Sequence, residues 1–218
     1  MKLQKRFVAV LLCAVMALAA LTACSGGSVP TKLEWANSHT KQYFDAKGVT
    51  PQEFTLTASM SVSGVKTNLK FAVKGKRAGY ELGSQDGLKT HVDENGDVYQ
   101  QYSGDTTWWH KYPAGSPTAD SYAASTRACY GYFVLPDAES IGSIAAGEYK
   151  DGSKVYYTET IKLHQNGVYA TYTYCFEGSE LSCILMESAN GMMNNIELKP
   201  TADEAVIAIP PVDRVIND

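Results

Sequence analysis

Short turn signals divide most of this chain into segments of about ten residues. The signals are glycines and glycine-containing dipeptides: Gly64, Gly75, Asp86-Gly87, Asn95-Gly96, Gly104-Asp105, Asp151-Gly152, Asn166-Gly167, Gly178-Ser179 and Asn190-Gly191. Asn-Gly and Asp-Gly supply the positive φ angles that tight hairpins require. Between the turns, apolar and polar residues alternate, as they do from Phe54 to Val62 and from Thr67 to Val73. A period of two with one apolar face indicates half-buried antiparallel strands, so the sequence predicts a β-meander.

Two segments depart from this alternation. Residues 31–47 place apolar side chains at helical spacing before Gly48, which predicts an N-terminal amphipathic helix with Leu33, Ala36, Thr40, Tyr43 and Phe44 on its inner face. Residues 113–147 have neither alternation nor hairpin dipeptides, and within them Asp137 to Ala146 is predicted to form a short helix. So long a connection is either a lid or plug over a cavity or a crossover between two halves of the sheet, and the sequence leaves both open.

The predicted fold class is therefore mainly β, in the α+β sense. Roughly nine or ten twisted strands tend to curl. The sequence thus predicts a curved antiparallel meander sheet forming a half-barrel, with the N-terminal helix and a short helical plug on its concave face.

The N-terminus has the three parts of a bacterial lipoprotein signal. Basic residues (Lys2, Lys5 and Arg6) precede an apolar run that ends in the lipobox Leu21-Thr22-Ala23-Cys24. We expect cleavage before Cys24 and a diacylglyceryl anchor on its thiol, which tethers the protein to the extracytoplasmic face of a bacterial membrane. The alternative is a retained transmembrane helix, but the uncharged stretch is shorter than the about 20 residues that a span needs.

These signals predict four parts of the chain: a signal peptide (1–23), a flexible tether (24–30), a single domain (31–212) and a C-terminal tail (213–218). Removing residues 1–23 takes away three of the 19 Lys and Arg and none of the 23 Asp and Glu, which leaves a net charge of −7. An acidic chain of this kind is not expected to bind nucleic acid, which is recognised by basic surfaces.

Three cysteines remain besides Cys13 in the signal and Cys24 at the lipobox. They are Cys129, Cys175 and Cys183. A three-residue loop after Glu177 would place Cys175 opposite Cys183 and allow a disulfide. A two-residue Gly178-Ser179 turn would instead pair Tyr174 with Cys183 and leave free buried thiols, and the sequence does not choose between the two registers.

Signs of catalysis are missing from the sequence. His39, His91, His110 and His164 are scattered singly, without metal-site spacing. The acidic turn Asp93-Glu94-Asn95-Gly96-Asp97 resembles a calcium loop but lacks the required glycine and glutamate, since Val98 and Gly104 stand there. We predict no cofactor, no metal and no enzymatic activity.

The last third of the chain resembles the LolA/LolB/LppX-like superfamily of half-barrel carriers of lipids and lipoproteins. The likeness is strongest at Val155-Tyr-Tyr-Thr-Glu-Thr, at Thr173-Tyr-Cys-Phe-Glu-Gly-Ser-Glu-Leu and in the ending from Ile196 to Pro210, which looks like that superfamily's closing strand pair. The resemblance implies a half-barrel domain at the cell envelope. It supplies no catalytic or binding residue.

Two functions from different classes follow from these observations. The first is a carrier or binding module that holds a lipid or other hydrophobic ligand in the concave sheet, lined by the inward-facing residues Leu56, Ala58, Met60, Leu69, Phe71, Tyr80 and Leu82 and, from one of two adjacent tryptophans, Trp108. The second is a non-enzymatic sensor or interaction module with a self-filled core, whose partner would be another envelope protein.

Overall fold

The computed structural model of the chain describes residues 29–50, 52–83, 87–105, 107–129, 138–165, 168–187 and 190–217. The expected signal peptide and the lipobox Cys24 lie outside these residues. Within them, no helix is both long and apolar enough to cross a membrane.

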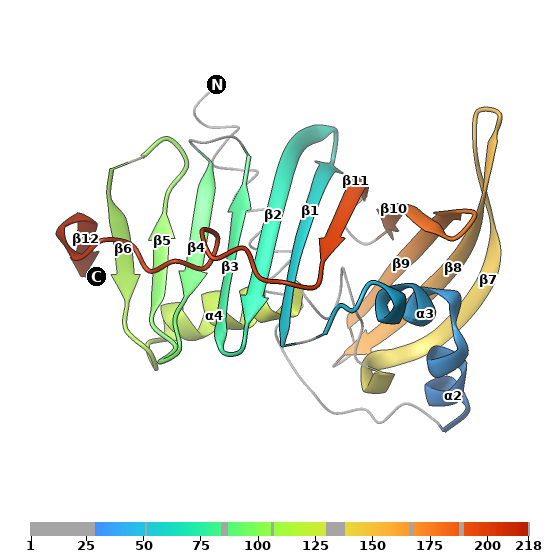
Figure 1. The fold of residues 1–218 in the computed structure, drawn as a ribbon, viewed down its shortest axis with the longest axis horizontal. Coiled ribbons are helices and arrows are strands. Elements are labelled where there is room, and N and C mark those ends of the chain that lie inside the picture. Colours follow the sequence, from blue (N-terminus) through green and yellow to red (C-terminus); the bar gives the residue numbers. More distant parts are fainter. Residues whose placement is uncertain are drawn as a thin grey trace.

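The described residues form one 12-stranded sheet, which confirms the mainly-β prediction. Its order is β12-β6-β5-β4-β3-β2-β1-β11-β10-β9-β8-β7 (Figure 1). The strands are β1 (Glu53–Val62), β2 (Val65–Lys74), β3 (Arg77–Leu82), β4 (Leu88–Val92), β5 (Val98–Gln101), β6 (Trp109–Tyr112), β7 (Ile141–Asp151), β8 (Lys154–Gln165), β9 (Val168–Glu177), β10 (Glu180–Met186), β11 (Gly191–Lys199) and β12 (Val215–Asn217).

Tight hairpins connect many consecutive strands, as the turn signals predict. Val62 pairs with Val65 across a loop of two residues, Ser63 and Gly64, whose φ angles are 49° and 80°. Positive φ at both central positions is the requirement of a type I′ turn, whose twist matches that of the flanking strands. Because this turn fixes the register, Leu56 stands opposite Phe71 and the apolar residues of β1 and β2 share one side of the sheet.

The sheet has two differently covered faces. Alternation places Leu56, Phe71, Tyr80 and Tyr174 on one side, where α2 (Val29–Asn37), α3 (His39–Ala46) and α4 (Pro117–Cys129) also lie; we call this the helix-covered face. The opposite side is crossed by residues 200–211, which we call the strap, and is named the strap face (Figure 1). The largest apolar cluster lies on the helix-covered face, and a smaller one joins Ala72 to Val206 and Ile207 of the strap.

The predicted N-terminal helix is present as two helices that break at Ser38. The Ser38 side chain accepts a hydrogen bond from the backbone N–H of Lys41, which caps α3, and donates one to the carbonyl of Trp35 at the end of α2. Thr40, Tyr43 and Phe44 are buried as predicted, whereas Leu33 is 64% exposed. Because the chain bends at Ser38, α2 and α3 point their buried faces in different directions. A single helical period over residues 31–47 therefore does not predict the buried residues of both helices.

The short helix predicted from Asp137 to Ala146 was wrong. Only a 3₁₀ turn, η2 (Ala138–Ser140), occurs there, Asp137 lies outside the described residues, and Ile141 to Ala146 begin β7. Pairing with β8 overrides the helix preference of the alanines, because Ile144, Ala145 and Ala146 stand opposite Ile161, Thr160 and Glu159. Among the described residues of the segment 113–147, the α-helix is α4, which ends at Cys129, before the predicted helix begins.

The connection between β6 and β7 is a crossover. It carries the chain from one end of the sheet to the other, since β7 is an edge strand and β6 is next to the opposite edge. The strap then returns the chain over the other face, from β11 to the 3₁₀ turn η4 (Val212–Arg214) and β12. Residues 196–210 are therefore one strand followed by the strap, and the closing strand pair expected from the resemblance was wrong.

The predicted strong curvature was also wrong, because the sheet is open and not strongly curled. Its edges, β12 and β7, do not pair with each other. Curling is expected where a sheet must bury one apolar face on itself, but here helices cover one face and the strap packs on the other. The sheet is largely antiparallel, and among the described strands β12 and β6 form the one parallel pair. β12 lies in the segment 213–218 that the sequence assigns to a tail.

Candidate functional site

The candidate ligand-lining residues of the central strands come together on the helix-covered face. Leu56, Ala58 and Met60 lie on β1, and the register places Leu69 and Phe71 of β2 beside them. In turn, Phe71 stands opposite Tyr80 of β3, and Leu69 opposite Leu82. All seven are at most 8% exposed and belong to one apolar cluster. We call this set the central apolar layer.

Helices flank the central apolar layer on both sides. α2 packs mainly on the edge strand β7, and α3 inserts Phe44, which meets Tyr174 of β9 edge-to-face at 6.1 Å. α4 packs on β3, β4 and β5, where Ala119 contacts the cluster of Val92 and Val98. The central apolar layer thus lies between the main contacts of the two helical groups.

Trp108 does not join the central apolar layer. It is 44% exposed, whereas Trp109, the first residue of β6, is buried and lies against the ring of His91 with centroids 4.6 Å apart. The sequence predicts that one of the two adjacent tryptophans lines the ligand site, but neither belongs to the apolar cluster of the helix-covered face. The buried one is Trp109, on the strap face.

A buried carboxylate holds α3 against the sheet. Glu159 of β8 is 5% exposed and accepts hydrogen bonds from the backbone N–H groups of His39 and Thr40, at 2.8 and 2.7 Å, and from the hydroxyl of Thr40 at 2.6 Å. These donors belong to the first turn of α3, which would otherwise have no partners within the helix. The sequence contained a signal that we did not use: Glu159 is a charged residue in the inward stripe formed with Ile161 and Leu163.

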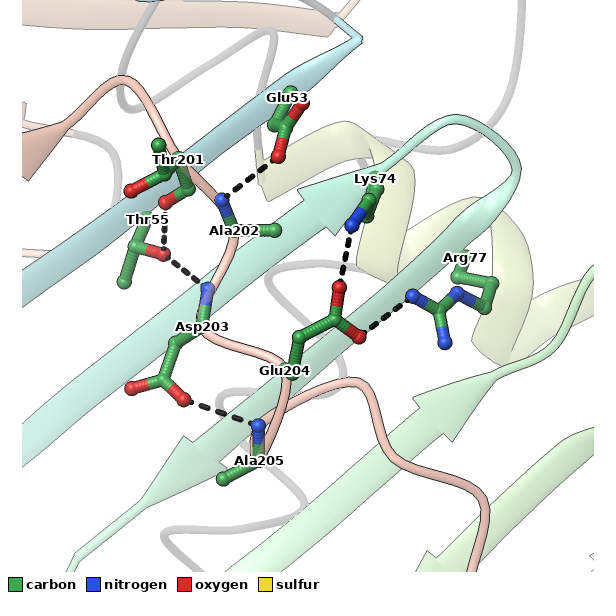
Figure 2. Close-up of polar contacts among 9 residues, drawn as sticks. All are labelled: Glu53, Thr55, Lys74, Arg77, Thr201, Ala202, Asp203, Glu204 and Ala205. Carbon is green, nitrogen blue, oxygen red and sulfur yellow. Dashed lines mark hydrogen bonds and ion pairs between the residues drawn. The ribbon is translucent and has the colours of Figure 1, made fainter.

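The strap is fixed by paired polar contacts at its start (Figure 2). The Thr55 hydroxyl donates to the carbonyl of Thr201 at 2.8 Å and accepts from the backbone N–H of Asp203 at 2.7 Å. Glu204 binds Lys74 at 2.5 Å and Arg77 at 2.7 Å. The hydrogen bond donated by Lys74 lowers the pKa of Glu204, and the hydrogen bond donated by Arg77 lowers it further by a smaller amount. These contacts attach the strap to β1, β2 and the start of β3.

Gly79 allows the strap to lie directly on β3. A Cβ atom at this position would stand 2.0 Å from the carbonyl oxygen of Val206 and 3.2 Å from that of Thr90. Val206 is itself fully buried against Ala72. Only the absence of a side chain permits this approach of two backbones.

His91 binds the far end of the strap. Its Nδ1 contacts the carbonyl oxygen of Ala208, and its Nε2 has no partner among the described residues. Burial lowers the pKa of His91 to about 4, with a smaller contribution from Lys89 in the same direction, so the ring is neutral at pH 7 and Nδ1 is the donor to Ala208.

The β9–β10 hairpin combines features of both predicted registers. The turn has the two residues Gly178 and Ser179, and Phe176 pairs with Leu181. A β-bulge between Leu181 and Cys183 then shifts the register, so that Cys183 stands opposite Cys175 and Tyr174 opposite Ile184. Both thiols are buried and no disulfide joins them in this structure, where the Cys175 thiol donates a hydrogen bond to the carbonyl oxygen of Thr173 at 3.7 Å.

No grouping suited to a metal ion occurs among the described residues, where three or more His, Cys, Asp or Glu side chains never converge. An open polar depression lies at the β2–β3 turn and the β4–β5 turn, lined by Lys74, Gly75, Lys76, Arg77, Glu94 and Asn95. Two of its basic side chains already bind Glu204. We therefore assign these basic side chains to holding the strap on the sheet.

Comparisons with known proteins find similar solved structures at low sequence identity. No protein-family model matches the chain, and no curated protein matches it. A solved structure of an uncharacterized conserved protein from Thermus thermophilus is 11% identical with a TM-score of 0.44, covering 82% of this chain and 97% of that one. A DUF1329 family protein from Desulfovibrio piger is 8% identical with a TM-score of 0.29, covering 84% and 96%.

Proposed function

We propose that this chain is a lipid-anchored extracytoplasmic lipoprotein whose helix-covered face binds a lipid or another hydrophobic ligand. The lipobox ending at Cys24 supports the location. One observation carries the binding activity: seven inward residues from three strands form a continuous apolar layer between α2–α3 and α4. Ligand sites are mostly apolar, and the flexible thioether of Met60 can adapt to an alkyl chain.

The resemblance to the LolA/LolB/LppX-like carriers remains part of this proposal. Two of its segments fall on β8 and on the β9–β10 hairpin, and the third on β11 and the strap. The carrier function that it implies agrees with an apolar layer. No reacting group accompanies that layer in the described residues, so we propose binding without catalysis.

A self-filled core is the second candidate, and one specific observation favours it. Every residue of the central apolar layer is already shielded from solvent by the chain itself. Protein interiors contain few voids larger than a water molecule. In that case the protein is an interaction or sensor module, and its partner is another envelope protein.

A bulky substitution distinguishes the two candidates. The test compares a soluble form beginning at Ser25 with its Ala58→Trp variant, measuring uptake of a fluorescent fatty acid and the free energy of unfolding. A ligand-binding layer predicts uptake by the unsubstituted protein, and loss of uptake at little cost in stability in the variant. Ser61→Trp, on the same strand but the opposite face, is the matched control and should still take up the probe.

Failure of the binding proposal would be equally clear. No uptake by the unsubstituted protein, together with destabilisation of Ala58→Trp by the about 1–3 kcal/mol typical of overpacking, would show a filled core. Native mass spectrometry and lipid extraction of the same protein would then find no co-purified lipid.

A further inference from the structure

We propose that Cys175 and Cys183 are an oxidation site that forms a disulfide across the β9–β10 hairpin. This inference is independent of ligand binding. It rests on the proposed extracytoplasmic location only for the supply of an oxidant in the cell, because such compartments permit disulfides.

The register supplies the geometry. Residues directly opposite each other on antiparallel strands have Cα atoms about 4.5–5.5 Å apart, which lies within the about 4.4–6.8 Å range of disulfides. Cys175 and Cys183 are such a pair only because the bulge at Ser182 adds one residue to β10. No change in the backbone pairing is needed to join them.

The surroundings suit a protected structural bond. The pair lies in a small apolar cluster on the strap face with Tyr156, Tyr149 and Met192, and the two tyrosine rings stack at 6.0 Å. Cys175 is fully buried and Cys183 is 6% exposed. Within the described residues no third metal ligand accompanies them, so a dithiol metal site is not the explanation. Burial would protect the bond from reductants once it has formed.

The oxidation needs a disulfide as the electron acceptor. The Cys183 thiolate attacks one sulfur of the oxidant, which releases the first thiolate and leaves a mixed disulfide. The Cys175 thiolate then attacks the Cys183 sulfur and releases the second. The protein loses two protons and two electrons, and the oxidant is reduced to two thiols. Cys183 attacks first because it is the more exposed thiol, 6% against 0% for Cys175. Its contact with Cys175 also lowers its pKa, whereas the same contact and burial raise the pKa of Cys175.

The test uses the full chain purified in detergent, unfolded in urea and refolded in a mixture of reduced and oxidised glutathione. Remaining thiols are alkylated, and the protein is cleaved after glutamate without reduction. Glu177 and Glu180 lie between the two cysteines, so cleavage there leaves two peptides that only a disulfide can hold together. We expect one linked species, lighter by two hydrogen atoms than its separated peptides, which reduction divides. Cys129→Ala should retain the link, and Cys183→Ala should lose it.

Other products would overturn the proposal: both cysteines alkylated, stable glutathione adducts on either one, or a bond from either to Cys129. In a second experiment, free thiols are alkylated as the cells are lysed, and the disulfide is then mapped by the same cleavage after glutamate without reduction. A bond that forms on refolding but is absent from cells would support the pair and contradict the extracytoplasmic location. Failure of fatty-acid uptake would leave both experiments unaffected.

Discussion

The carboxylate of Glu159 accepts hydrogen bonds from both the backbone N–H and the hydroxyl of Thr40, at 2.7 and 2.6 Å, across 119 positions of the sequence. This contact joins the first turn of α3 to the middle of β8. It is buried, so it is shielded from water and from salt. It sets the position of the helix whose Phe44 packs on the large apolar cluster.

Glu159→Ala should therefore loosen α3 from the sheet. Three donors of α3 and the hydroxyl of Tyr157 would lose their acceptor, and we expect the free energy of unfolding to fall by about 1–3 kcal/mol. Urea denaturation measures this loss. Glu177→Ala is the matched control, because the ion pair of Glu177 with Lys154 is exposed and should contribute at most about 1 kcal/mol. Equal losses in the two variants would contradict the role of Glu159.

Strands with one buried face could be predicted from the sequence, whereas the edge strand β7 could not. In β1 the alternation from Phe54 to Val62 reports burial directly. Most of β7 is exposed, so its sequence carries no alternation, and the strand is defined by its pairing with β8 and its contact with α2. Likewise, no turn signal in the sequence marks the bulge at Ser182, because the bulge depends on how β10 pairs with its neighbouring strands.

The helix α4 had a readable start signal that we did not use. Ser116 precedes Pro117, and its hydroxyl accepts a hydrogen bond from the backbone N–H of Ala119. Serine at the N-cap followed by proline at the first helical position is typical of a helix start. By contrast, the partners of Glu159 and His91 lie more than a hundred residues away in the sequence, and only the folded chain brings them together.

The stability of the protein should fall as the pH decreases from about 6.5 to about 4, because of His91. Burial lowers its pKa to about 4 in the folded state, so between these values the unfolded chain binds a proton that the folded chain does not. The sign is therefore destabilising on acidification, by about 2 kcal/mol at about pH 5 relative to neutral pH.

Denaturation curves across this pH range test the effect. His91→Asn retains a donor for the carbonyl of Ala208 but does not titrate, so its profile should be flatter above about pH 4.5. Asp203 and Glu204 also have lowered pKa values, chiefly through hydrogen bonds from Lys70 and Lys74 respectively, but they lose their contribution at lower pH, below their unfolded values. If the free energy of unfolding depends on pH in the same way in His91→Asn, the loss of stability on acidification comes from a group other than His91.

Gly79→Ala should displace the strap from β3. The added Cβ would stand 2.0 Å from the Val206 carbonyl oxygen, and neither backbone can yield without breaking its own contacts. We expect a loss of about 1–3 kcal/mol in the free energy of unfolding and faster cleavage of the strap after Glu204 by a glutamate-specific protease.

Gly147→Ala provides the control for Gly79→Ala. It is also a strand glycine, but its nearest neighbour would be the Thr158 hydroxyl at 3.2 Å, a side-chain atom that can move. Its effect on stability should be much smaller, and the strap should remain protected from the glutamate-specific protease. Rapid cleavage after Glu204 in both variants, or in neither, would show that Gly79 does not determine how the strap lies.

Cys24→Ala should abolish the membrane anchor. The lipobox Leu21-Thr22-Ala23-Cys24 predicts that the Cys24 thiol receives the diacylglyceryl group and that the signal peptide is then removed. Without the thiol neither step can occur, so the variant should accumulate as an uncleaved precursor that radioactive palmitate does not label. Cys129→Ala is the matched control and should be processed and labelled like the unsubstituted protein. Palmitate labelling that persists in Cys24→Ala would disprove the anchor, and with it the extracytoplasmic location on which the proposed function depends.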